Sequence, residues 1–156
     1  MAQDRAQSLT GLFFARSARL ADKPFLWVKR PGPGSTNSDD SPRYQSMSWR
    51  ETAEKVNALA RGLLHLGLAA GDRVCLVAEN RPEWLMADLA ILAAGGVTVP
   101  AYCTNGVTDH LHILTDSGAR FAIVSTAGLA ARLLPAAARA KVDAVLAPAG
   151  LSGLFA

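Results

Sequence analysis

The sequence predicts an α/β protein in which helices flank a mostly parallel sheet. From residue 73 onward, short apolar runs alternate with helical patterns in the order strand, helix, strand, helix, strand, helix, strand. Such alternation requires right-handed crossovers between parallel strands. The run Arg73–Ala78 is apolar from Val74 onward, which is typical of a strand covered on both faces. With 156 residues, of which 50% are hydrophobic, the chain has the length and apolar content of one globular domain.

The first elements predict a helix followed by a hairpin. A helix over Ser8–Ala21 carries a loose apolar stripe and stops at the Asp22–Pro24 turn. The apolar run Phe25–Val28 and the segment Tyr44–Met47 are predicted to be the two strands of the hairpin. Residues 30–43 between them are rich in Pro, Gly, Ser and Asp and show no periodicity, so we expect a flexible surface loop there.

A second helix follows the hairpin. Ser48 and Glu51 have the S-x-x-E spacing of a capping box, in which each side chain takes a free backbone N–H at the helix start. Glu51 and Lys55 form a favourable i,i+4 pair, and Gly67 is suited to end the helix. The apolar positions of this helix share one face; they are Trp49, Ala53, Val56, Ala60 and Leu63.

The third helix is predicted to be buried. Pro82 and Glu83 lie at its start, and its body, Trp84–Ala94, is apolar all round except for Asp88. Gly95 and Gly96 end it. The later elements then alternate: a strand at Val97–Pro100, a helix capped by Thr108 or Asp109 and ending near Gly118, a strand at Arg120–Ser125, a helix containing Leu129, Leu133 and Leu134, and a strand at Val142–Leu146.

The last predicted strand would leave one sheet edge uncovered. We therefore expect residues 1–156 to be an incomplete N-terminal domain of a larger fold. Apolar surface on the Trp84–Ala94 helix or at the sheet edge would then be exposed, and we expect self-association.

Composition and charge exclude several classes of protein. The 16 Lys and Arg and 13 Asp and Glu residues leave a net charge of +3 without a basic cluster, which argues against nucleic-acid binding. Cys75 and Cys103 are too few for a disulfide framework and lack C-x-x-C spacing. The N-terminus has no apolar secretory segment, so we expect a cytoplasmic protein. The most apolar stretch, Trp84–Tyr102, is interrupted by Asp88 and Pro100 and does not predict a membrane span.

Individual residues predict no self-contained active site: no catalytic, cofactor-binding or metal-ligating residue is assigned. Gly32–Gly34 fails the G-x-G-x-x-G phosphate-loop pattern. His110 and His112 would lie ~200° apart around a helix and cannot share a metal ion. Cys103 has no cation within two residues to activate its thiol, and we interpret it as a spectator. Asp88 is either a functional acid or, more commonly for such a residue, a partner of a buried donor.

Five segments together carry a family resemblance: Met47–Thr52, Gly71–Val74, Glu79–Trp84, Leu92–Pro100 and Thr115–Arg120. In this order and spacing they resemble the AMP-forming acyl-CoA synthetases of the adenylate-forming ligase superfamily. The resemblance covers roughly residues 8–147. It is closest to the long-chain fatty acid branch, through Glu79–Trp84 and Ala101–Asn105, although Cys103 takes the place of a common proline. The first and fourth segments are interpreted as packing elements.

The resemblance implies a ligase that makes an acyl-adenylate from a fatty acid and ATP with Mg²⁺, then passes the acyl group to coenzyme A. It also allows peripheral contact with a membrane. The family's phosphate loop, nucleotide motifs and catalytic lysine would follow residue 156, so we expect this chain to be inactive alone and to bind none of these ligands tightly. Two alternatives stay open: another acid-activating ligase (medium-chain, aryl or amino acid), or a small non-catalytic α/β binding or interaction module.

Overall fold

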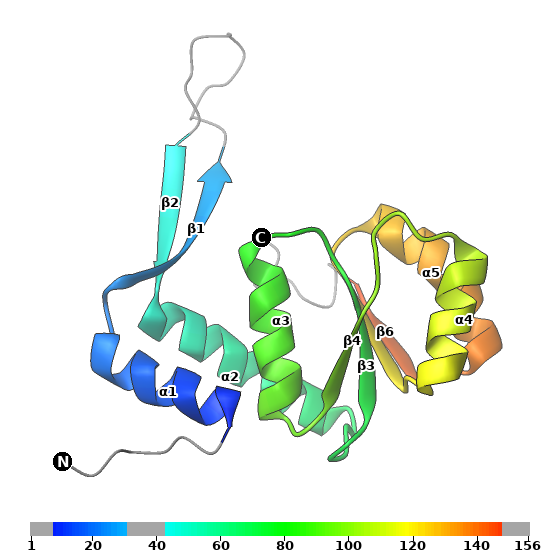
Figure 1. The fold of residues 1–156 in the computed structure, drawn as a ribbon, viewed down its shortest axis with the longest axis horizontal. Coiled ribbons are helices and arrows are strands. Elements are labelled where there is room, and N and C mark those ends of the chain that lie inside the picture. The colour runs from blue at the N-terminus through cyan, green and yellow to red at the C-terminus, as the bar shows by residue number, and fades with distance from the viewer. Residues whose placement is uncertain (1–7, 31–42, 148–156) are drawn as a thin grey trace, which may run out of the picture. The chain divides into compact units, whose positions relative to one another are not determined.

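The computed structural model describes residues 8–30 and 43–147 (Figure 1). Most of the loop predicted at 30–43 lies outside the described residues. The chain divides into two compact units, Met1–Lys55 and Val56–Ala156. No helix in the described ranges is long and apolar enough to cross a membrane.

The first unit contains the predicted helix and hairpin. Helix α1 (Leu9–Leu20) is capped by Ser8, whose Oγ accepts the Gly11 N–H at 3.1 Å. Strands β1 (Pro24–Arg30) and β2 (Arg43–Ser48) pair in antiparallel register. Both strands are longer than predicted, because their ladder continues through polar residues that carry no apolar signal.

Aromatic packing joins α1, β1 and the start of α2 (Trp49–His65). The rings of Phe25 and Trp49 are stacked with centroids 3.7 Å apart, and the buried Phe13 ring lies 6.0 Å from each. The predicted capping box is confirmed: Ser48 N donates to Glu51 Oε2 at 2.7 Å, and Glu51 N donates to Ser48 Oγ at 3.2 Å. The stacked pair therefore fixes where the hairpin ends and α2 begins.

The second unit is a parallel sheet of four strands in the order β4-β3-β5-β6, which confirms the predicted class (Figure 1). Helix α3 covers one face of the sheet, and α4 and α5 cover the other. The elements, in chain order, are β3 (Arg73–Val77), α3 (Pro82–Ala93), β4 (Val97–Pro100), α4 (Val107–Ser117), β5 (Phe121–Val124), α5 (Ala127–Ala140) and β6 (Ala144–Leu146).

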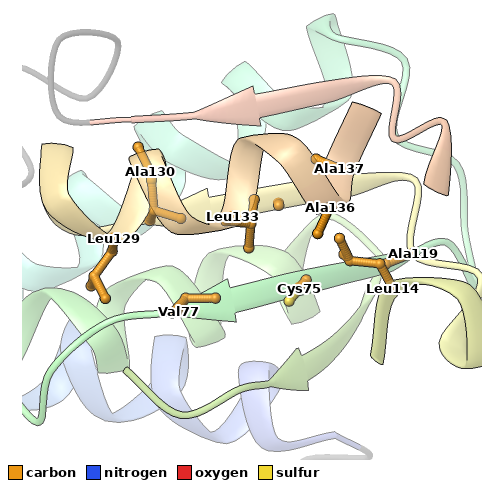
Figure 2. Close-up of a cluster of buried hydrophobic side chains, with 11 residues drawn as sticks. Cys75, Val77, Leu114, Ala119, Leu129, Ala130, Leu133, Ala136 and Ala137 are labelled. Atoms are coloured by element: carbon orange, nitrogen blue, oxygen red, sulfur yellow. The ribbon is translucent and has the colours of Figure 1, made fainter. Parts of the chain in front are cut away.

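A buried cluster fills the space between β3, β5 and the helices α4 and α5 (Figure 2). Cys75 and Val77 of β3 lie opposite Leu129 and Leu133 of α5. Small alanine side chains on the buried stripe of α5 allow its backbone to approach the sheet closely. Burial of this cluster contributes apolar stabilisation to the second unit.

The start of α4 corrects one prediction. Neither Thr108 nor Asp109 is the N-cap: the helix begins at Val107 after Gly106. Asp109 instead occupies the third helical position, and its Oδ2 accepts the Gly106 N–H at 2.9 Å. Glycine carries no side-chain signal, so the sequence pattern pointed to the next polar residues.

Two of the family segments meet at the amino edge of the sheet. Gly71 N donates to Gly95 O at 2.8 Å, and Val97 N donates to Asp72 O at 2.8 Å. Gly95 has φ +85°, and a Cβ on Gly96 would lie 3.2 Å from Asp72 O. Gly95 is therefore required by its left-handed backbone conformation and Gly96 by the close approach of Asp72 O, which supports the interpretation of this segment as a packing element.

Arg73 and Arg120 extend the same edge. Arg73 Nε donates to Ser117 O at 2.8 Å and its Nη2 to Gly118 O at 3.0 Å, so the guanidinium caps the C-terminal end of α4. Arg120 bridges the carboxylates of Asp72 and Asp143, the latter at 2.7 Å. The amino ends of β3, β5 and β6 are thereby tied together.

We predict that Gly118→Ala destabilises the chain by about 1–2 kcal/mol, whereas Gly62→Ala stabilises it by about 0.5–1 kcal/mol. Gly118 has φ +60°, and its added Cβ would lie 2.8 Å from Arg73 Nη2; Gly62 sits inside α2 with no atom within 4 Å of an added Cβ. Urea unfolding of both variants measures the difference, and equal midpoints for the two would contradict the capping role of Arg73.

Candidate functional site

The topology singles out one place on the sheet for ligand binding. Strands β3 and β5 are neighbours, yet the chain leaves β3 toward α3 on one face and leaves β5 toward α5 on the other. Such a divergence is a topological switch point, and open parallel sheets bind ligands there, outside the carboxyl ends of the strands. The candidate site is therefore the loop pair that follows β3 and β5.

A hydrogen bond between Glu79 and Ser125 spans this switch point. Ser125 Oγ donates to Glu79 Oε2, and Ser125 N donates to Val77 O at 3.2 Å. Ser125 is buried, whereas Glu79 is exposed. The hydroxyl lowers the pKa of the Glu79 carboxyl, so the group is ionised at neutral pH. The pair places a negative charge at the carboxyl edge of the sheet and links the loops that follow β3 and β5.

Cys103 lies nearby in the half-buried loop after β4. Burial raises the pKa of its thiol, Glu79 raises it further, and the Arg132 cation of α5 acts in the opposite direction. The thiol is therefore protonated at neutral pH and lacks the thiolate that nucleophilic chemistry requires. Sequence neighbours alone did not reveal Arg132, because α5 brings it from about thirty residues away.

Within the segment Glu79–Trp84, Arg81 and Glu83 form an ion pair with each other. The Glu83 carboxylate in the first turn of α3 is only 5% exposed, and Arg81 Nε lies 2.8 Å from it. This pairing compensates a buried charge, and the Glu83 hydrogen bond raises the pKa of Arg81. Only Glu79 and Asn80 of this segment are freely exposed at the carboxyl edge.

The remaining sequence candidates are dispersed. His110 is fully buried in α4, His112 is exposed on the same helix, and Asp88 is half-buried on α3. Within residues 8–30 and 43–147, no three His, Cys, Asp or Glu side chains gather to hold a metal ion. Gly32–Gly34 lies outside the described residues. The structure thus brings Glu79, Cys103 and Ser125 to one edge and leaves the other candidates elsewhere.

The side chains at this edge are suited to hydrogen bonding with a ligand and not to covalent catalysis. The described residues place the Glu79 carboxylate, the Ser125 hydroxyl that donates to it and the protonated Cys103 thiol at the switch point. The lowered pKa makes Glu79 a weak base and Ser125 is buried, so this pair is not an activated nucleophile. Sequence reasoning missed the Glu79–Ser125 pair. The available signal was position, since each residue follows a predicted buried strand and neighbouring parallel strands end at the same edge.

Comparison with known proteins identifies the family. Residues 13–152 match the family model of the AMP-binding enzymes. The chain belongs to this AMP-binding enzyme family. The match confirms the resemblance read from the five sequence segments.

Two relatives show how the chain compares in length. It is 46% identical over 76 residues to the long-chain-fatty-acid–CoA ligase FadD15 of Mycobacterium tuberculosis. This match covers 49% of this chain and 13% of that protein. The chain is 36% identical over 102 residues to the phenylacetyl-CoA ligase epaB of Aspergillus niger, covering 64% and 18%. The chain thus spans less than a fifth of the length of either relative.

A solved structure supports the fold. The long-chain-fatty-acid-CoA ligase FadD1 from Archaeoglobus fulgidus superposes with a TM-score of 0.75 over 95% of this chain and 29% of that chain, at 22% identity. At this identity the likeness shows the fold alone. It agrees with the α/β class that the alternating elements predicted.

We predict that Glu79 and Ser125 are coupled by about 1 kcal/mol, as expected for a hydrogen bond to a partly exposed charged group. The free energies of unfolding of Glu79→Gln, Ser125→Ala and the double variant form a double-mutant cycle that measures this coupling. Asn80→Ala, at the neighbouring exposed position, is the control and should show no coupling to Ser125→Ala. Additive effects of the first pair would mean that the two loops are not linked through this bond.

Proposed function

We propose that this chain is the N-terminal part of an ATP-dependent long-chain fatty acid–CoA ligase. The observation that carries the proposal is the family match over residues 13–152, together with the 46% identity to a long-chain ligase. The proposed enzyme joins the carboxylate of a fatty acid to the AMP portion of ATP with release of pyrophosphate. The thiol of coenzyme A then takes the acyl group, the acyl–phosphate bond breaks, and AMP is released. Mg²⁺ would accompany the ATP.

The role proposed for these residues is scaffold. Two of their family segments bond to one another through the backbone at the amino edge of the sheet, at Gly71, Asp72 and Gly95, instead of presenting side chains to a ligand. The opposite edge offers a linked loop pair without a catalytic constellation. We therefore assign no catalytic, cofactor-binding or metal-ligating residue to this chain and propose that residues 1–156 are one part of a larger catalytic domain in a cytoplasmic enzyme, with membrane contact limited to the surface.

Acyl specificity is the finer part of the proposal. The relationship to a phenylacetyl-CoA ligase favours an aryl substrate as the second candidate. A small non-catalytic binding or interaction module is the alternative from a different class. It would need a sheet that is stable with the exposed edges of β4 and β6.

We predict that the chain alone catalyses no ATP–pyrophosphate exchange, whereas a chimera in which it replaces the homologous segment of FadD15 retains acyl-CoA synthesis. The reason is that a scaffold of the same fold can be exchanged while the reactive groups stay on the host. Radiolabelled pyrophosphate exchange and thioester formation with palmitate and phenylacetate are the measurements. Exchange by the isolated chain would refute incompleteness, and an inactive but folded chimera would count against the family role.

We also predict that the isolated chain self-associates, because Val97 on the edge strand β4 is 47% exposed and both outer strands lack a partner among the described residues. Light scattering with a dye for exposed apolar surface tests this expectation. A sharp monomer peak with a cooperative melt and low dye binding would favour the binding-module alternative.

A further inference from the structure

His110 is a buried imidazole without a described partner. It lies in the first turns of α4, a helix that packs against α5, and its side chain has no solvent exposure. Neither Nδ1 nor Nε2 has a hydrogen-bond partner within the described part of the chain. Buried polar atoms are nearly always paired, so this imidazole is an exception that needs a physical account.

The charges around His110 oppose a second proton on the ring. Arg132, on the facing helix α5, is a cation that acts on His110. Among the described residues, Asp109 on α4 is the anion that acts on it, and that carboxylate already accepts the Gly106 N–H at 2.9 Å. The ring also lies near the N-terminal, positive end of the α4 dipole. Desolvation, then Arg132, lower the pKa of His110 below its ordinary 6.5.

We propose that His110 makes the α4–α5 layer acid-sensitive, because protonating the ring would place an unpaired cation inside the layer and beside Arg132. The layer covers the sheet face formed by Cys75 and Val77, so its opening exposes the apolar side chains of Leu114 and Leu133. Acid thus lowers the free energy needed to open the helical layer and expose this apolar surface. This inference concerns the stability of the fold and does not depend on the proposed ligase function.

The direction follows from proton linkage. In the open state the imidazole titrates at its ordinary value of 6.5, while in the closed state it stays neutral to lower pH. The open state therefore binds more protons in this interval, and the closed layer is favoured above about pH 6.5 and loses stability as pH falls below it. Each pH unit in the interval shifts the open-to-closed ratio by up to about tenfold. Because Arg132 lowers the pKa of His110 in the closed layer, it extends the pH interval of this stability loss toward lower pH.

Hydrogen–deuterium exchange of the whole chain between pH 7.5 and 5.5, corrected for intrinsic exchange, tests the proposal. In the parent chain, opening of α4 and α5 should rise by up to about tenfold per pH unit below 6.5, whereas the β1–β2 hairpin serves as an internal reference. His110→Leu should abolish this rise. The same substitution at the exposed His112 of α4 is the matched control and should leave the rise unchanged.

Arg132→Gln is a second, surface variant that keeps the test decisive if His110→Leu does not fold. Removing this cation should reduce the acid-induced opening, because His110 then titrates closer to its ordinary pKa in the closed layer. A parent chain whose α4 exchange is flat with pH, a rise that persists in His110→Leu, or a rise that Arg132→Gln steepens would each overturn the proposal, whereas a rise that Arg132→Gln leaves unchanged would assign the acid sensitivity to desolvation of His110 alone.

Discussion

The second unit depends on how the amino end of β3 is held. Arg73 places one guanidinium on the carbonyls of Ser117 and Gly118, so the strand that pairs with both β4 and β5 also caps the helix that crosses between them. Backbone bonds from the Asp72 turn to Gly95 and Val97 hold the neighbouring strand. Contacts from this one short segment therefore fix the positions of β3, β4 and α4 relative to one another. Each contact uses a specific backbone group, and a strand shifted in register would not reach that group.

This arrangement separates the two edges of the sheet by role. The amino edge uses its polar groups on one another, through Arg73, Asp72 and Arg120, and leaves little for a ligand. The carboxyl edge carries the diverging loops and the Glu79–Ser125 bond. Two of the five family segments meet at the amino edge, where their backbone groups bond to one another, so these motifs can identify the family without carrying a reactive group. The residues of these two motifs make contacts that hold the sheet together.

The packing of α4 and α5 combines an apolar core with a buried imidazole. Small and aliphatic side chains close this layer against β3, and the same closure removes water from His110. A neutral imidazole tolerates such a site at modest cost, whereas a charged ring beside Arg132 does not. The apolar packing and the proposed proton sensitivity therefore have one origin in the close approach of these two helices.

The sequence by itself determined the order of the elements, the parallel class, the Ser48–Glu51 capping box and the family, because each depends on local periodicity or on short motifs. Only the tertiary structure decided the rest. Strand order, the pairing of Glu79 with Ser125, the action of Arg132 on Cys103 and His110, and the choice of Gly106 over Thr108 or Asp109 at the start of α4 could not be predicted. Most of these depend on which distant residues meet when the crossovers close, and the last depends on a glycine backbone that carries no side-chain pattern.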